Sequence, residues 1–581
     1  MGLESLCLGQ TNQFTKVDAT PRPATSDVAA IEVRFGREFD RRLTDSRVDK
    51  FSTWLVLLLL TGAAVLLHGY HPYVEDAEIY LPGIERILNP QLFPTGQKFF
   101  QSHASMSLFS NLVAYSIRAT HLSLESGLFL WHVASIFLLL LACWELTSIL
   151  FSSARARWGG VCLIAGLLTI PIAGTALYIM DQYLNARNLA AFAAVFAVAR
   201  TLQKKYLQAA LWILFAASVH PLMWVFPFSF CALWMVLQKI EGNVKAMISN
   251  VKTSPIAMAC LTLAWIPLVS QVSPAYHEAA TLHANHYIQN WEWYEWLGIV
   301  APLGVFWWLG RMVRTRQQAF LARVCRAFLM YGLIYVAVSL VLDLPARFES
   351  LARLQPMRSL HLLYIFLFLC LGGLLGEYAL RKSMWRWMAL FVPLSLGMFV
   401  AQRSLFPASV HLEWPGRAAK NPWAQAFVWI RQNTPVNAVF ALDPGYMHIE
   451  GEDEIGFRCL AQRSRLADAI KDNGVVSMFP LLADEWWAQV QAQTPWKHFR
   501  AADFERLRDK YGVTWIIVEQ PGVPGIDCEY KNSTLQVCRL PASAPALAGA
   551  HTDGGEHDDD RIERAKVVSL RMREVVGERK E

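Results

Sequence analysis

The chain has 581 residues, of which 54% are hydrophobic, 12% aromatic and 17% charged; its mean hydropathy is +0.27. Soluble domains have about 25% charged residues, so this deficit excludes an ordinary soluble protein and indicates many membrane spans. The net charge of +6 is spread in short clusters between apolar runs, which is typical of a membrane orientation signal, so we expect no nucleic-acid partner.

The first 50 residues are polar and end in a basic cluster. No cleavable signal peptide is indicated, and we expect residues 1–50 to be a cytoplasmic tail. From Phe51 to Val74 the chain has no Asp, Glu, Lys or Arg. This stretch is long enough to cross a bilayer and is the first predicted span.

Ten further apolar stretches bring the predicted number of spans to eleven. They are Gly127–Phe151, Trp158–Met180, Ala186–Ala199, Tyr206–Val219, Leu222–Leu237, Ser254–Val272, Trp296–Gly310, Ala327–Leu342, Ser359–Gly376 and Trp387–Ala401. The region from Tyr206 to Leu237 is too long for one span, and His220-Pro221 interrupts it, so a tight helical hairpin is expected.

Alternate loops are rich in Lys and Arg, whereas the loop from Ser273 to Glu295 has neither. This asymmetry fits the positive-inside rule only if the moderately apolar stretch Met106–Ile117 does not span. We expect that stretch to be an interfacial or re-entrant helix on the outer surface. The sequence thus predicts a multi-pass protein of the plasma (inner) membrane, with its N-terminus cytoplasmic and its C-terminal part extracytoplasmic.

Beyond the last span the sequence alternates helix and strand signals. Asn421-Pro422 predicts the start of a helix, and Val436–Leu442 reads as a strand. Asp503 is expected to cap a helix over Phe504–Tyr511 that ends at Gly512, before a strand at Val513–Val518. A small extracytoplasmic α/β domain is predicted.

The predicted organisation therefore has four parts. These are the tail 1–50, a transmembrane region 51–406 whose first external loop is 70–126, the α/β domain 407–540, and a flexible charged tail 541–581.

Of the ten cysteines, three are predicted to lie outside: Cys459, Cys528 and Cys538. Cys528 and Cys538 flank a predicted hairpin, so they can form a disulfide, although nothing in their spacing requires one.

An acidic cluster follows the first span directly. The segment from His71 to Tyr80 reads HPYVEDAEIY and places three carboxylates, Glu75, Asp76 and Glu78, within four residues. One such carboxylate can accept a proton from an attacking hydroxyl, while its neighbours raise its pKa by like-charge repulsion or bind a divalent metal ion. The alternative is a solvated acidic loop that caps the next helix.

This pattern resembles the C-type (GT-C fold) glycosyltransferases, polytopic membrane enzymes that use polyprenyl-phosphate-linked sugars. The similar residues are His71 to Phe93, including Tyr80-Leu81-Pro82-Gly83, then Leu354-Gln355-Pro356-Met357-Arg358, and Lys510-Tyr511-Gly512-Val513. The resemblance covers about Phe51 to Leu540 and is to uncharacterised bacterial members.

The resemblance implies that Asp76 or Glu75 acts as a general base, or helps bind a metal and the donor phosphate. Glu78 and His71 are expected near the substrate, and Asp76 with Glu78 could hold a divalent metal, the one cofactor that the pattern suggests. Many such enzymes have a second acidic residue further along this loop. The segment after Phe93 has none, and Glu85 is the nearest substitute.

A polyprenyl phosphate leaves as an anion at the membrane surface, so cations are expected there. Arg187 is the first candidate, because the uncharged run after it is too short to cross alone and draws it toward the membrane. Arg358, beside Pro356 at the start of a span, is the second. Head-group contacts or pairing with Asp181 would explain such residues equally well.

Other patterns carry less functional information. His283 and His286 form a His-x-x-His pair, which could bind zinc but has no third ligand in the pattern, so a neutral, exposed histidine pair is expected. No nucleotide-binding motif is present. A membrane glycosyltransferase whose partners are the bilayer and a polyprenyl-phosphate-linked sugar is thus the first hypothesis. A transporter or flippase of a lipid-linked or anionic solute and a non-catalytic assembly protein are the alternatives.

Overall fold

Long apolar helices make up much of the computed structural model, which describes residues 51–247, 273–283, 286–315, 318–343, 351 and 353–541. The predicted N-terminal tail, the predicted span Ser254–Val272 and the predicted tail beyond residue 541 lie outside these residues. The described residues from Leu59 onward belong to one compact unit.

Six helices in the described ranges are long and apolar enough to cross a bilayer, which indicates an integral multi-pass membrane protein. They are Phe51–His68, α5 (Leu124–Leu150), Trp293–Val313 of α12 (Trp293–Thr315), Ala319–Leu342 of α13 (Ala319–Asp343), Pro356–Leu380, and α16 (Met384–Leu405). The fifth combines η5 (Pro356–Ser359), α15 (Leu360–Leu374) and η6 (Leu375–Leu380). Each overlaps a span predicted from the sequence.

Three further helices lie between α5 and α12 in the chain: α7 (Ala186–Leu202), α8 (Tyr206–Val219) and α9 (Val225–Met247). The predicted break at His220-Pro221 is confirmed. The His220 side chain accepts hydrogen bonds from the backbone N–H groups of Leu222 and Met223, both at 3.2 Å, so it caps the turn that proline opens.

The predicted continuous span Trp158–Met180 is wrong. Helix α6 (Ala154–Gly166) has 13 residues, and the chain then forms an irregular loop with an isolated bridge between Pro171 and Tyr178. Pro171 has no backbone N–H to donate to a helical carbonyl, and a side chain at Gly174 would lie 2.6 Å from the Trp291 ring. Hydropathy alone did not distinguish this buried loop from a span.

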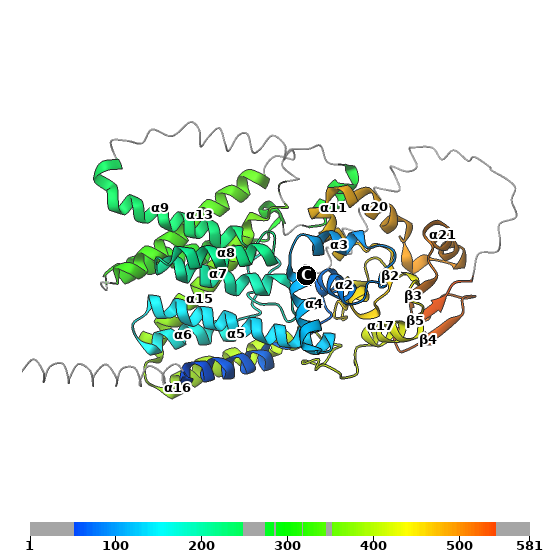
Figure 1. The fold of residues 1–581 in the computed structure, drawn as a ribbon, viewed down its shortest axis with the longest axis horizontal. Coiled ribbons are helices and arrows are strands. Elements are labelled where there is room, and N and C mark those ends of the chain that lie inside the picture. Colours follow the sequence, from blue (N-terminus) through cyan, green and yellow to red (C-terminus); the bar gives the residue numbers. More distant parts are fainter. Residues whose placement is uncertain are drawn as a thin grey trace, which may run out of the picture. The chain divides into compact units, whose positions relative to one another are not determined.

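The predicted first external loop folds into α2 (Ala77–Leu88), α3 (Lys98–Ser105) and α4 (Phe109–Thr120). Figure 1 shows these helices between the long helices and the sheet. The stretch Met106–Ile117 falls largely in α4, whose 12 residues are too few to cross a bilayer.

The C-terminal region has a five-stranded sheet in the order β2-β1-β3-β5-β4 (Figure 1). The strands are β1 (Val439–Ala441), β2 (Ser464–Arg465), β3 (Trp515–Glu519), β4 (Cys528–Lys531) and β5 (Leu535–Arg539). Strand β1 pairs in parallel with β2 and β3, whereas β3, β5 and β4 are antiparallel. The predicted mixed α/β character is confirmed.

Helices of this region are α17 (Pro422–Asn433), α18 (Phe457–Ala461), α19 (Lys471–Met478), α20 (Ala483–Ala492) and α21 (Ala501–Tyr511). Asn421 caps α17, as predicted. Helix α21 begins three residues before the predicted start, because Asp503 lies inside its first turn and accepts from the Arg500 backbone N–H at 2.7 Å.

Two further features tie this region together. A disulfide joins Cys528 and Cys538, which face each other on β4 and β5. Helix α11 (Pro274–Thr281), from a loop between predicted spans, packs through Tyr276 and Ala279 into an apolar cluster with Trp486. The residues that follow α11 are therefore held against α19.

Candidate functional site

A cavity of about 530 Å³ lies where α2, the start of α7, η5 and α19 meet. Its walls combine residues that are hundreds of positions apart in the chain. Ionisable side chains in the lining include Glu75, Asp76, Asp181, Arg187, Arg358, Glu454 and Lys471. The structure thus brings together Asp76, Glu75, Arg187 and Arg358, four of the residues expected at the site.

Asp76 is the centre of the charged part of the cavity. Its carboxylate accepts a hydrogen bond from Arg187 Nη1 at 2.7 Å, and Lys471 Nζ lies 3.6 Å from its other oxygen. The Asp76 side chain is 26% exposed, whereas Arg187 is 9% exposed. Both side chains line the cavity, and the acid is the more exposed of the two.

Glu75 shares the same lysine. Lys471 Nζ pairs with the Glu75 carboxylate and lies 3.8 Å from Glu454. Burial opposes ionisation of Asp76, yet Arg187 and Lys471 hold its pKa well below the usual range. Burial also opposes ionisation of Glu75, but Lys471 outweighs this effect and lowers the pKa of Glu75. The expectation that neighbouring acids raise the pKa of the motif carboxylates thus does not hold for these two residues.

Among the described residues, the Arg358 guanidinium has no ion pair, whereas the other two cations of the cavity are paired. It lines the cavity at the start of a span, and its Nε is buried without a hydrogen-bond partner among the described residues. Arg187, by contrast, pairs with both Asp76 and Asp181. Arg358 is therefore available for an anion in the cavity.

The cavity also concentrates unusual backbone geometry. Ten non-glycine residues in the described part of the chain have positive φ. Half of them line the cavity: Glu75, Ala173, Ala176, Gln355 and Glu454. Such conformations cost about 1–3 kcal/mol each and cluster at functional sites, where the surrounding structure enforces them.

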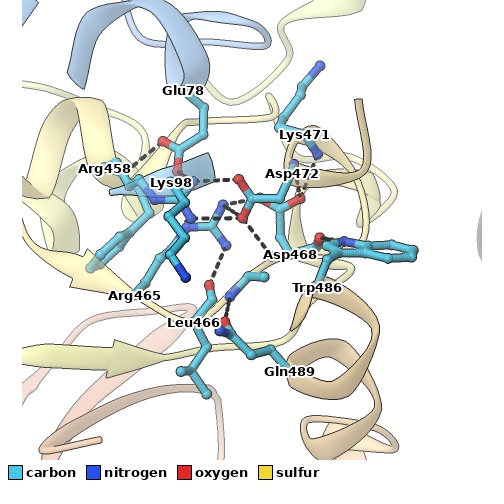
Figure 2. A network of polar contacts seen from close by, with 12 residues as sticks. Glu78, Lys98, Arg458, Arg465, Leu466, Asp468, Lys471, Asp472, Trp486 and Gln489 are labelled. Carbon is cyan, nitrogen blue, oxygen red and sulfur yellow. Dashed lines mark hydrogen bonds and ion pairs between the residues drawn. The ribbon is translucent and has the colours of Figure 1, made fainter. Parts of the chain in front are cut away.

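Glu78, only two residues from Asp76, does not line the cavity. Its carboxylate is fully buried and accepts from Arg465 Nε at 3.0 Å, Arg458 Nη1 at 3.3 Å and the Arg458 backbone N–H at 2.7 Å. Figure 2 shows the resulting network, in which Asp468 and Asp472 complete the arginines' contacts. Glu78 therefore joins α2 to the C-terminal region and has no free oxygen for a substrate.

The same network also fixes the position of Lys471. Asp468 accepts from the backbone N–H groups of Ile470, at 2.7 Å, and Lys471, at 2.5 Å. The Lys471 side chain points away from the network in Figure 2 and reaches Glu75. The buried charges thus fix the start of α19 so that its lysine meets the acidic motif.

His71 also has a protein partner. Its Nδ1 lies 2.9 Å from Glu413, and its ring stacks on Phe406 at a centroid distance of 4.0 Å. It does not line the cavity around Asp76. This histidine joins the first external loop to the segment after the last span.

The residues present do not fit a divalent metal. Throughout the described ranges, no group of three His, Cys, Asp or Glu side chains could hold a metal ion. Asp76 faces Arg187 and Lys471, and Glu78 faces two other arginines. Cations in these positions compete with a metal for the carboxylates.

Lys471 is the main site residue that the sequence did not reveal, because it lies in the α/β domain, 395 positions after Asp76. The His-x-x-His pair was identified in the sequence, but it was predicted to be exposed. His283 and His286 stack at 4.8 Å and line the cavity, so they belong to its wall.

No protein-family model matches the chain, and no curated protein matches its sequence significantly. Among solved structures it is similar to the archaeal oligosaccharyltransferase AglB from Archaeoglobus fulgidus, in complex with an inhibitory peptide and a dolichol-phosphate. The TM-score is 0.42 at 15% identity, covering 81% of this chain and 70% of that chain.

Proposed function

We propose that this chain is a membrane glycosyltransferase that moves a sugar from a polyprenyl-phosphate donor to an acceptor on the extracytoplasmic face. One observation carries the proposal: an ionised Asp76 shares a cavity with Arg187, Arg358 and Lys471. A carboxylate beside anion-binding cations is what transfer from a phosphate leaving group requires.

In the proposed reaction an acceptor oxygen forms a bond to the anomeric carbon of the sugar. The bond between that carbon and the phosphate oxygen breaks, and its electron pair leaves on the phosphate. Arg358 and Arg187 stabilise this charge, and Asp76 takes the proton from the acceptor.

The low pKa of Asp76 in the structure is compatible with this role. Arg187 is its closest cation, and a donor phosphate would share that guanidinium. Sharing weakens the pull of Arg187 on Asp76 and raises the pKa of the acid toward its ordinary value. Donor binding would therefore activate the base, and we derive no step that involves a metal.

The position of Arg358 supports a lipid-linked donor. It lies in η5, at the first turn of the candidate span Pro356–Leu380. An arginine at the end of a span is at head-group level, where the phosphate of a lipid carrier also lies.

The disulfide Cys528–Cys538 supports an extracytoplasmic location for the C-terminal region, because disulfides persist in oxidising compartments. Arg358, Asp76 and Lys471 would then face the same side as that region. This agrees with the orientation expected from the basic loops.

The test is titration of purified protein in nanodiscs with farnesyl phosphate. Wild-type protein should bind saturably, and Arg358→Ala should weaken binding about tenfold or more, since a charge-assisted hydrogen bond contributes about 1.5–3 kcal/mol. Arg353→Ala is the matched control, because Arg353 lies in the same segment but does not line the cavity.

Equal binding by wild-type protein and Arg358→Ala, with both folded, would remove Arg358 from the site. No saturable binding by folded wild-type protein would overturn the proposed function itself.

A further inference from the structure

One wall of the cavity is built from uncharged polar side chains. Gln355 Nε2 lies 2.8 Å from His286 Nε2, and the His286 ring stacks on His283. The His283 ring in turn hydrogen-bonds the backbone of Asn473. Gln355, His283, His286 and Asn473 form a continuous surface, which we call the neutral wall.

Three atoms of the neutral wall are buried without a hydrogen-bond partner in the described structure: Gln355 Oε1, His283 Nε2 and Asn473 Oδ1. The Gln355 residue is 8% exposed and Asn473 is 2% exposed. An unsatisfied buried polar atom costs about 1–3 kcal/mol. Three on one wall of one cavity indicate a ligand that satisfies them.

All three atoms are hydrogen-bond acceptors. The carbonyl oxygens of Gln355 and Asn473 can only accept. Burial lowers the pKa of His283 to about 4, so its imidazole is neutral and has a single N–H. That proton is donated to the Asn473 backbone, which leaves Nε2 as an acceptor.

The neutral wall adjoins the cationic part of the cavity through two short segments. Gln355 and Arg358 belong to one turn, in which the Arg358 N–H donates to the Gln355 carbonyl at 3.0 Å. Asn473 follows Lys471 by two residues on α19. Gln355 has a φ of 46°, a strained conformation that the fold maintains at this position.

We propose that the neutral wall binds the sugar of the donor, and that this sugar is uncharged and rich in hydroxyl groups. The inference rests on the proposed function and adds the substrate class. Hydroxyl groups donate hydrogen bonds to the three acceptors, while the adjoining arginines bind the phosphate. A sugar that carries a carboxylate would place acceptor oxygens and negative charge against three buried atoms that can only accept hydrogen bonds.

The experiment compares three kinds of phosphodiester of equal charge at the phosphate, all with a farnesyl chain: the methyl ester, the hexosyl esters of glucose, mannose and galactose, and the glucuronosyl ester. At least one hexosyl ester should bind wild-type protein in nanodiscs about tenfold more tightly than the methyl ester. The glucuronosyl ester should show no gain over the methyl ester.

Asn473→Ala and His283→Ala should each lose most of the hexosyl gain and keep the affinity for the methyl ester. That retained affinity shows that the variant is folded. Asn433→Ala is the control, because Asn433 is exposed on α17, away from the cavity.

A methyl ester that binds as tightly as every hexosyl ester would overturn the sugar site and leave the proposed function standing. A glucuronosyl gain, or an unchanged hexosyl gain in both variants, would overturn the sugar site in the same way. Failure of folded wild-type protein to bind any of the phosphodiesters would overturn the proposed function and this inference together.

Discussion

Asp76 and Glu78 lie two residues apart in one acidic motif, yet they have opposite environments. Asp76 is 26% exposed, toward a cavity, and contacts Arg187 and Lys471. Glu78 is fully buried and contacts Arg458 and Arg465. Residues at i and i+2 near a helix start point in different directions, so one acid faces the cavity and the other faces the C-terminal region.

One short motif therefore holds both the proposed base, Asp76, and a residue that positions it, Glu78. The network around Glu78 has three acids and two arginines, all with side chains at most 2% exposed. It adds little net stability relative to an apolar core, but it allows few alternative arrangements. It therefore fixes α2 against α19, and Asp76 against Lys471.

The largest expected effect comes from the cavity side of the motif. Asp76→Asn should lower sugar transfer about 10²–10⁴-fold, because an amide cannot accept the acceptor's proton. Binding of farnesyl phosphate should persist, since Arg358 and Arg187 remain. The measurement is transfer from the hexosyl donor identified in the binding experiment, to water or an added acceptor.

Asp484→Asn, at an exposed site on α20, is the matched control and should transfer sugar normally. Unchanged transfer by folded Asp76→Asn would show that Asp76 is not the base, and would leave Glu75 as the motif acid to test.

Glu78, on the buried side of the motif, should mainly affect the stability of the protein. Every contact of the Glu78 carboxylate is a donor, so Glu78→Gln turns one acceptor into a donor that faces other donors. We expect a loss of about 3–5 kcal/mol in the free energy of unfolding, seen as a lower Tm in detergent.

Glu85→Gln on the same helix is the control. Burial raises the pKa of Glu85 to about 8, so its carboxyl is protonated at neutral pH and resembles an amide. Its Tm at pH 7 should stay close to that of wild-type protein. Equal Tm values for Glu78→Gln and Glu85→Gln would contradict a structural role for the buried network.

The last effect concerns pH and is spread over several pH units. Between the ordinary Glu value of 4.5 and about 8, the folded chain keeps the Glu85 proton that the unfolded chain releases. Stability therefore falls as pH rises through this window, by at most about 1.4 kcal/mol per unit. Tm measured from pH 5 to 8 should fall more steeply for wild-type protein than for Glu85→Gln, and parallel curves would refute the assignment.

Local chemistry in the sequence predicted much of the fold. Asn421-Pro422 and Gly512 marked helix ends because capping depends on adjacent residues. Apolar runs gave the six long helices, since crossing a bilayer depends on length and composition. The stretch Trp158–Met180 was misread because a loop buried in protein is as apolar as a span.

For the candidate site, too, some features follow from the sequence and others only from the tertiary structure. The sequence by itself determined that acids follow the first long apolar helix and predicted that Arg187 and Arg358 stand at membrane level, because residue type and position relative to a span set both. Only the tertiary structure decided that Asp76 meets Lys471 while Glu78 is buried, and that His283, Gln355 and Asn473 share a wall. Such pairings join positions hundreds of residues apart, and packing between α2, η5 and α19 selects them; no local pattern encodes that choice.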